Sequence, residues 1–196
     1  MSAIPAFDIG IWNAWILQMI FFILISAPDL FISKEAKVST KRATESIPLS
    51  KTHKRLALST HIIIMPLAFI YCIFLPLKLG TAWFYVGLLI FAIAVIMTIM
   101  TSINYATTPL DKPVTKGIYR ISRHPIYLGA FLFYLGIGIT AASWILLLFA
   151  LAWIIIWNIV VPEEEHILIE KYGDSYREYM NKTPRWIGIP KSEKRA

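Results

Sequence analysis

The stretch that decides the fold runs from residue 126 to residue 161 and reads IYLGAFLFYLGIGITAASWILLLFALAWIIIWNIVV. Its 36 residues include no Asp, Glu, Lys or Arg. A hydrocarbon core about 30 Å thick is crossed by about 20 apolar helical residues, so the stretch is too long for one span. One continuous helix would be longer than about 50 Å. The sequence ITAAS at 139–143 is typical of a tight reversal, and it predicts two short helices, 126–140 and 144–161.

The whole chain has the composition of an integral membrane protein. Of its 196 residues 57% are hydrophobic and 16% are charged, against about 25% charged in ordinary globular domains. The length favours one domain, 1–196. Cys72 is the only cysteine and lies in an apolar run, which excludes a disulfide framework and a thiolate metal site. Because the basic residues flank apolar runs, the net charge of +7 indicates contact with lipid head groups rather than nucleic acid.

Three more apolar runs precede the hairpin, at 9–27, 56–77 and 80–101. Pro28 and Asp29 are expected to end the first run, and Pro66 and Pro76 to kink the second. The N-terminal sequence MSAIPAFDIG has no basic region or cleavage site, so the first run is expected to be a retained span. The sequence therefore predicts an all-α bundle of five transmembrane helices.

The basic residues lie almost entirely on one side of this predicted bundle. Seven Lys or Arg fall in 28–55, four in 102–125 and seven after residue 161, whereas the other side has only Lys78. By the positive-inside rule the N-terminus is outside and the C-terminus is cytoplasmic. An aromatic belt at the outer interface is expected from Trp12, Trp15, Trp83 and Trp144.

The segment after the last run, 162–186, is half apolar and predicts an amphipathic helical region at the cytoplasmic face. Gly173 and Asp174 interrupt its pattern, Ser175 is expected to cap a second helical piece, and Pro184 to end it. Residues expected on one helical face are Ile167, Leu168, Tyr172, Tyr176 and Tyr179.

Two polar segments flank the predicted hairpin. DKPVTKGIYRISRHPIYLG (111–129) leads into it and PEEEHIL (162–168) leaves it, so both meet at one membrane face. Arg123, His124 and Tyr127 are then expected to face the glutamates at 163–165. Such a polar cluster above apolar walls suits a soluble cofactor held over a lipid acceptor.

The residues alone leave a structural cytoplasmic collar open. Arg120 and Arg123 are also ordinary membrane anchors, and acidic residues favour the start of a helix. His61 is more often a packed residue of a span than a catalyst. The four histidines have no metal-ligand spacing, and no phosphate loop or nucleophile elbow is present in the sequence.

At these residues the chain resembles the isoprenylcysteine carboxyl methyltransferase family, including its small archaeal and bacterial members. The resemblance covers roughly the C-terminal half and rests on Arg123, His124, Pro125, Tyr127, Gly129, Glu164, Glu165, Tyr172, Gly173, Tyr176, Tyr179 and Pro184. It implies S-adenosylmethionine as methyl donor and no metal. The cofactor contacts that it implies are Asn104, Asp111, Lys112, Pro113, Val114, Tyr119, His124, Pro125, Ile126, Tyr127 and Glu164, with Arg123 and Glu164 as candidate catalytic residues.

The resemblance further implies carboxyl O-methylation of a prenylated cysteine-like lipid. A carboxylate acceptor has no proton to lose, so catalysis rests on alignment and exclusion of water. The chain has Val160 where eukaryotic members carry an arginine that holds the substrate carboxylate. Two alternatives remain: phospholipid N-methylation, and an NADPH-dependent sterol or steroid reductase, which the glutamate pair and short loops disfavour. The sequence does not indicate an oligomeric state.

Overall fold

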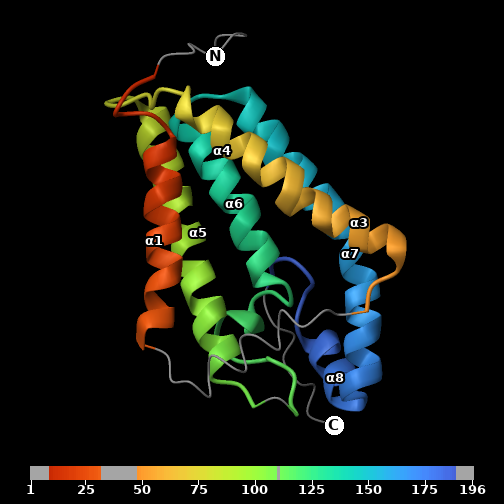
Figure 1. The fold of residues 1–196 in the computed structure, drawn as a ribbon. Helices are drawn as coiled ribbons and strands as arrows, with labels where there is room; N and C mark the ends of the chain where they lie inside the picture. Colours follow the sequence, from red (N-terminus) through yellow and green to blue (C-terminus); the bar gives the residue numbers. More distant parts are fainter. Residues whose placement is uncertain (1–8, 32–47, 110, 189–196) are drawn as a thin grey trace.

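The computed structural model describes residues 9–31, 48–109 and 111–188, which are helical apart from short connections and one isolated bridge, Asn13 to Pro76. Its α-helices are α1 (Trp15–Phe31), α3 (Lys51–Ser59), α4 (Met65–Ile73), α5 (Ala82–Ala106), α6 (Pro125–Thr140), α7 (Trp144–Tyr172) and α8 (Asp174–Lys182). A π-helical turn, Thr60–Ile64, joins α3 to α4, and a 3-10 turn, Gly117–Arg120, precedes α6. Figure 1 shows α1, α5 and α6 side by side, and α3 alongside α7.

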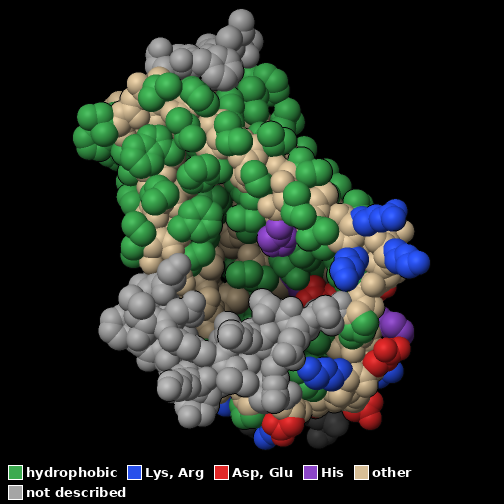
Figure 2. Space-filling model, viewed as in Figure 1, with side chains coloured by type: hydrophobic (Ala, Val, Ile, Leu, Met, Phe, Trp, Pro, Cys, Tyr) green, Lys and Arg blue, Asp and Glu red, His purple; other side chains and the backbone are tan. Residues whose placement is uncertain are grey.

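These helices have the length and surface of membrane helices. The continuous helices Lys51–Ile73, Ala82–Ala106 and Trp144–Tyr172 are long and apolar enough to cross a membrane, and Trp15–Ile25 and Pro125–Thr140 are shorter apolar helices. Large apolar side chains face outward, as Leu89 does with 64% exposed. In Figure 2 apolar side chains cover the upper part of the face, and the charged ones that are visible lie lower, toward the end with α8. An apolar surface of this extent indicates contact with lipid.

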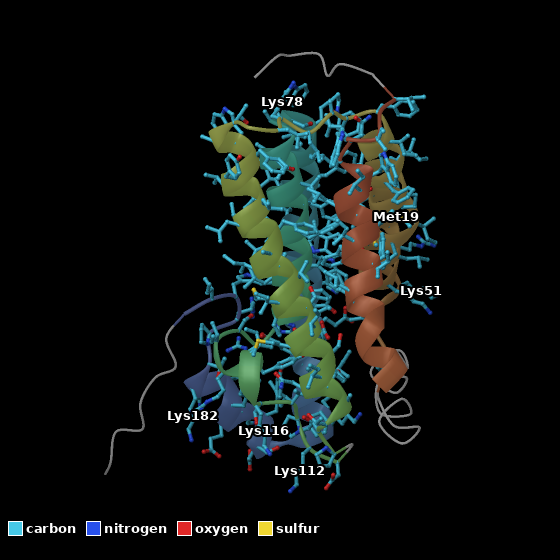
Figure 3. The ribbon with its side chains drawn as sticks, turned by 90° about the vertical axis from the view of Figure 1, so that its left-hand side faces the viewer. Met19, Lys51, Lys78, Lys112, Lys116 and Lys182 are labelled. Carbon is cyan, nitrogen blue, oxygen red and sulfur yellow. The ribbon has the colours of Figure 1, made fainter. Side chains whose placement is uncertain are left out.

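The two ends of the bundle differ in charge. Lys78 lies at one end, and Lys112, Lys116 and Lys182 lie at the other (Figure 3). The turn between α6 and α7 is at the Lys78 end, because Lys78 N donates to Thr140 O at 2.9 Å. The basic residues of the predicted asymmetry that fall in 32–47 and 189–196 lie outside the described residues.

The predicted hairpin is confirmed: α6 ends at Thr140 and α7 begins at Trp144. Ala142 adopts the left-handed conformation, φ 50°, which reverses the chain. The side chain of Ser143 then caps α7 by accepting from Leu146 N. Helix α6 packs closely on α5 at Gly87, where an added Cβ would lie 2.4 Å from Thr140 N.

Two expectations for the first run were wrong. The helix begins at Trp15 rather than residue 9, because the preceding residues pair with the chain after α4. Asn13 Nδ2 donates to Ile73 O at 2.7 Å, and Ala14 N donates to Leu75 O at 2.8 Å. Pro28 and Asp29 do not end α1, which continues to Phe31. A proline removes one backbone hydrogen bond, and a helix held by its neighbours tolerates that loss.

The second run departs from the prediction at both ends. Its helix begins at Lys51 and ends at Ile73 rather than running from 56 to 77. Before Pro66 the helix widens into the π-helical turn, where Met65 N bonds back to Thr60 O. Pro76 does not kink the helix, because it lies beyond the helix end in the bridge to Asn13.

Helices α5 and α7 both extend beyond the apolar segments that predicted them. Helix α5 continues past residue 101 to Ala106, and α7 passes through Pro162 to Tyr172. The predicted break at Gly173 is present, with φ 61°, and α8 ends just before Pro184. Ser175 does not cap α8; its hydroxyl donates to Tyr172 O at 2.7 Å.

Candidate functional site

The three consecutive glutamates beyond the apolar part of α7 contact three different sets of residues. Successive helical residues point about 100° apart. Glu165 faces the segment before α6, and Glu164 faces Tyr127 of α6. Glu163 instead faces the start of α3, where it accepts from Ser50 N at 2.7 Å and contacts the His53 ring. The expected meeting of the two polar segments therefore holds for Glu164 and Glu165, and not for Glu163.

Glu165 is the centre of a buried charged cluster with 3% of its side chain exposed. It accepts from Arg123 Nε at 2.9 Å, from His124 Nε2 at 3.1 Å and from Arg185 Nη2 at 2.7 Å. Burial alone raises the pKa of a carboxyl group. The hydrogen bonds from His124 and Arg185 and the charge of Arg123 outweigh that effect and lower the pKa of Glu165 to about 2. Glu165 is thus an ionised carboxylate with both oxygens bonded to donors of the same chain.

Arg123 joins this cluster to the end of α8. Its Nη1 donates to Met180 O at 2.9 Å and to Thr183 O at 2.7 Å, while Nε bonds to Glu165. These carbonyls lie at the C-terminus of a helix, where a cation is favourable. Arg123, a candidate catalytic residue, is therefore engaged in holding the fold.

Glu164 is buried but sparsely bonded, with 14% of its side chain exposed. Within the described chain it receives one side-chain hydrogen bond, from Tyr127 Oη at 3.0 Å, and His124 Nδ1 lies 3.9 Å away. Burial raises the pKa of Glu164, and the nearby His124 and the Tyr127 hydroxyl only partly offset this. A carboxylate offers about four acceptor positions, so Glu164 retains capacity to bind another donor.

Aromatic rings surround Glu164. Tyr127 stacks on Trp157 of α7 with ring centroids 3.6 Å apart, and it also stacks on His124 at 5.8 Å. The rings of Tyr105 and Tyr119 lie 6.2 Å apart. Burial, with neighbouring Tyr105 and Glu164 among its other causes, raises the pKa of Tyr119 well above its usual value. These phenols therefore remain neutral hydrogen-bond donors.

The 3-10 turn that carries Tyr119 is shaped by Asn104. Asn104 Oδ1 accepts from Ile118 N at 3.0 Å. Gly117 has φ 59°, and an added Cβ would lie 2.3 Å from Asn104 Oδ1. Tyr119 O in turn accepts from Tyr179 Oη of α8 at 2.7 Å. Asn104, a predicted cofactor contact, thus positions Tyr119.

The other residues predicted to contact the cofactor differ in how deeply they lie around Glu164. Pro125 is buried at the first turn of α6, beside His124. Val114 packs in the apolar cluster with Tyr105. Asp111, Lys112 and Ile126 are exposed, and Pro113 is half-buried. The structure therefore gathers Tyr119, His124, Pro125, Tyr127 and Glu164 in a largely buried group, and these four residues lie nearer the surface.

Sequence reasoning missed Tyr105 and Trp157. The sequence predicted that this helix ends at residue 101, before Tyr105. Only the observed extension of α5 to Ala106 brings Tyr105 to the site. Trp157 belongs to a charge-free run in which a tryptophan is ordinary core. Its position seven residues before Glu164 is the available signal, because residues two turns apart share a helical face.

The comparisons with known proteins match the same part of the chain. A family model described as Phospholipid methyltransferase matches residues 79–175, which contain α5, α6 and α7. Protein-S-isoprenylcysteine O-methyltransferase of Schizosaccharomyces pombe is 38% identical over 81 residues, covering 39% of this chain and 32% of that protein. Protein-S-isoprenylcysteine O-methyltransferase B of Arabidopsis thaliana is 34% identical over 83 residues, covering 40% of each.

Over this segment the chain is similar to protein-S-isoprenylcysteine O-methyltransferases and to the phospholipid methyltransferase family model. It spans well under half the length of the two relatives that it matches. The family segment holds Tyr105, Tyr119, His124, Tyr127 and Glu164. Arg185 lies beyond the segment matched by the family model. Val160, the departure from the eukaryotic pattern, is fully buried.

Proposed function

We propose that this protein is a membrane enzyme that transfers a methyl group from S-adenosylmethionine to a lipid acceptor. The acceptor is a carboxylate resembling that of a prenylated cysteine, and the reaction is carboxyl O-methylation. The observation that carries the proposal is Glu164, a buried carboxylate with unused acceptor positions among aromatic rings. It lies where polar loops meet apolar helices, at the boundary that a soluble donor and a lipid acceptor would share.

The residues around Glu164 fit the donor's chemistry. S-adenosylmethionine supplies an electrophilic methyl group on a positively charged sulfur. Glu164 accepts hydrogen bonds from the ribose hydroxyls or the ammonium group, and Tyr119, His124 and Tyr127 hold the amino-acid end. The aromatic rings of Tyr105 and Trp157 favour a nearby cation. The other contacts of the family pattern complete the site: Asn104, Asp111, Lys112, Pro113, Val114, Pro125 and Ile126.

The reaction needs alignment more than acid or base. An acceptor carboxylate oxygen attacks the methyl carbon in line; the C–O bond forms as the S–C bond breaks, and the bonding pair stays on sulfur. No proton moves. The chain's part is to hold the two reactants in contact and keep water out.

We further propose that the chain acts as one domain, 1–196, with five spans formed by α1, α3 with α4, α5, α6 and α7. The Lys78 end faces outside, and the end with α8 and Glu164 faces the cytoplasm. The difference in basic residues between the two ends supports this orientation. The methyl donor then enters from the cytoplasm, and the acceptor arrives through the bilayer.

Phospholipid N-methylation is the second candidate, favoured by the description of the matching family model. A protonated amine acceptor must lose a proton before its lone pair can attack, which calls for a base that a carboxylate acceptor does not need. The NADPH-dependent reductase has no support from the comparisons above.

Two measurements separate these functions. Calorimetric titration of the detergent-solubilised protein should show binding of S-adenosylhomocysteine and none of NADPH. Radiolabelled methyl transfer should favour farnesylcysteine analogues over phosphatidylethanolamine, and should fall steeply from farnesyl to geranyl to prenyl chains, since each buried methylene contributes about 0.8 kcal/mol. Equal rates on a water-soluble acceptor would contradict the lipid-substrate proposal. NADPH binding without S-adenosylhomocysteine binding would favour the reductase.

A further inference from the structure

The indole N–H of Trp157 is a buried donor for which the described residues supply no acceptor. Trp157 has 5% of its surface exposed, and within the described residues no atom accepts from its Nε1. Two other tryptophans of the bundle differ: Trp153 Nε1 donates to Tyr127 O at 3.1 Å, and Trp186 Nε1 donates to Asn158 Oδ1 at 3.2 Å. Buried donors are nearly always bonded, so an orphan in a binding region calls for a ligand or a water to explain it.

The place of this donor is informative. Trp157 lies seven residues before Glu164 on the same face of α7, about 10 Å further into the apolar part of the bundle. Its ring stacks on Tyr127, whose hydroxyl bonds to Glu164. Val160 lies between Trp157 and Glu164 on this face and contributes no polar group. The Trp157 N–H is therefore close to the proposed binding site of the methyl donor, on the side that faces the apolar part of the bundle.

His61 is a second polar group at the same place. Its ring lies 5.9 Å from that of Trp153 and 6.2 Å from that of Trp157, on an otherwise apolar stretch of helix. Nδ1 lies 3.0 Å from Ala57 O and 3.0 Å from Thr60 Oγ1. In the described structure Nε2 has no hydrogen-bond partner. An ionisable residue within an apolar span is by default a functional candidate.

We propose that Trp157 Nε1–H binds one carboxylate oxygen of the lipid acceptor, with His61 forming the facing wall of this subsite. The inference rests on the proposed function, whose acceptor class it narrows. A carboxylate has two oxygens, so one accepts from Trp157 while the other attacks the methyl group. An amine acceptor has one lone pair, and the same hydrogen bond would occupy the pair that must react. Trp157 therefore selects a carboxylate acceptor over a phospholipid amine.

In this structure neighbouring side chains cover the Trp157 N–H, so the acceptor reaches it only when one of them moves. His61 is an exposed polar neighbour in ring contact with Trp157. Because the hydrogen bond holds the acceptor in the ground state as well as during transfer, its loss weakens acceptor binding more than it slows turnover. Trp157 thus acts in binding and selecting the acceptor, and does not act as a base.

The substitution that isolates this hydrogen bond is Trp157→Phe, which keeps an aromatic ring against Tyr127 and removes the N–H. We expect the KM for farnesylcysteine to rise about tenfold to a hundredfold, the range for a hydrogen bond to a charged group. The Kd for S-adenosylhomocysteine should stay within about twofold. Trp153→Phe is the matched control: its N–H is already bonded to Tyr127 O, so acceptor KM should not change. Trp157→Tyr replaces the phenylalanine variant if the latter does not fold.

A direct readout uses wild-type protein labelled with ¹⁵N-tryptophan in detergent. The indole resonance missing from the Trp157 variant should move on addition of farnesylcysteine, and should not move with a farnesyl thioether that lacks the carboxylate. An unmoved resonance together with an unchanged KM would overturn the proposal. If the wild-type protein binds S-adenosylhomocysteine and methylates farnesylcysteine while Trp157→Phe behaves identically, only this subsite is wrong. If it methylates nothing, the proposed function fails, and the resonance alone decides whether Trp157 binds a lipid carboxylate.

Discussion

Glu164 and Glu165 are adjacent in the sequence and lie in opposite environments. Glu165 lies among Arg123, His124 and Arg185. All three side chains donate hydrogen bonds to its carboxylate oxygens. Glu164 is also largely inside the protein, but Tyr127 is its one hydrogen-bond donor in the described structure. The pKa of Glu165 is lowered and that of Glu164 is raised. A saturated carboxylate stabilises a fold, whereas an unsaturated one is available to a ligand.

The largest expected effect is on stability. Glu165→Ala leaves the guanidinium of Arg123 buried without its counter-charge, and breaking a buried ion pair from one side costs about 3–5 kcal/mol. Thermal unfolding in detergent should show a much lower Tm. Glu164→Ala is the matched control and should be far less destabilising. Equal losses of stability in the two variants would remove the contrast between the two glutamates.

A pH dependence should separate the two carboxylates next. If the ionised Glu164 holds the donor, affinity for S-adenosylhomocysteine should fall by up to about tenfold per pH unit below its raised pKa. Glu164→Gln should bind weakly and with little pH dependence. The lowered pKa of Glu165 gives the folded state stability that is present above the pKa of an unfolded glutamate and lost only as the pH falls toward 2. Titrations from about pH 8 to about pH 5 therefore examine Glu164 in a folded protein. Identical pH profiles for the wild type and Glu164→Gln would exclude Glu164 as the responsible group.

Tyr127→Phe sharpens the comparison by removing the single described donor to Glu164. The carboxylate then becomes harder to ionise and less well oriented, while the ring can still stack on Trp157. Loss of one such hydrogen bond typically costs about 1 kcal/mol, or about fivefold in affinity. Calorimetry with S-adenosylhomocysteine measures it. Unchanged affinity, with an unchanged Tm, would mean that the Tyr127 hydroxyl does not orient Glu164 for binding.

The smallest effect is expected at Glu163, which ties α7 to the start of α3. Its pKa is lowered by the Ser50 backbone N–H first, then by the His53 and Ser50 side chains, against a partly opposing desolvation. The ionised Glu163 therefore stabilises the folded state at neutral pH. This stabilisation is lost as the pH falls through the lowered pKa of Glu163. Glu163→Gln should give a slightly lower Tm at neutral pH and a smaller difference at about pH 4. A difference that grows on acidification would have the wrong sign.

The sequence predicted the parts of the fold that follow from local pattern. A charge-free run too long for one span, with a reversal at its centre, sufficed for the α6–α7 hairpin. It also predicted the meeting of Tyr127 with Glu164, because a hairpin brings its two ends together. It failed where tertiary packing overrides pattern: Asn13 pairs with the chain after α4, so the apolar residues before Trp15 are not helical. Five spans and their orientation remain predictions.

The site was less predictable than the fold for a similar reason. Glu163, Glu164 and Glu165 are indistinguishable as a triplet, and only their directions on α7 assign each to different neighbours. Trp157 and Tyr105 lie in apolar helices where aromatic residues are common, so their residue type does not mark them as neighbours of Glu164. The available sequence signal is the seven-residue spacing between Trp157 and Glu164. The pairing of Glu163 with His53 joins residues far apart in the chain, which a single sequence does not reveal.

The central claim is that Glu164 and its aromatic neighbours bind the methyl donor, and calorimetric titration with S-adenosylhomocysteine tests it most directly. Wild-type protein should bind, and Glu164→Ala should bind about tenfold to a hundredfold more weakly, the range for losing a charged hydrogen bond, without a matching loss of Tm. His124→Ala should also weaken binding, but with a fall in Tm because it removes a donor to Glu165. A folded Glu164→Ala variant that binds S-adenosylhomocysteine like the wild type would place the donor site elsewhere.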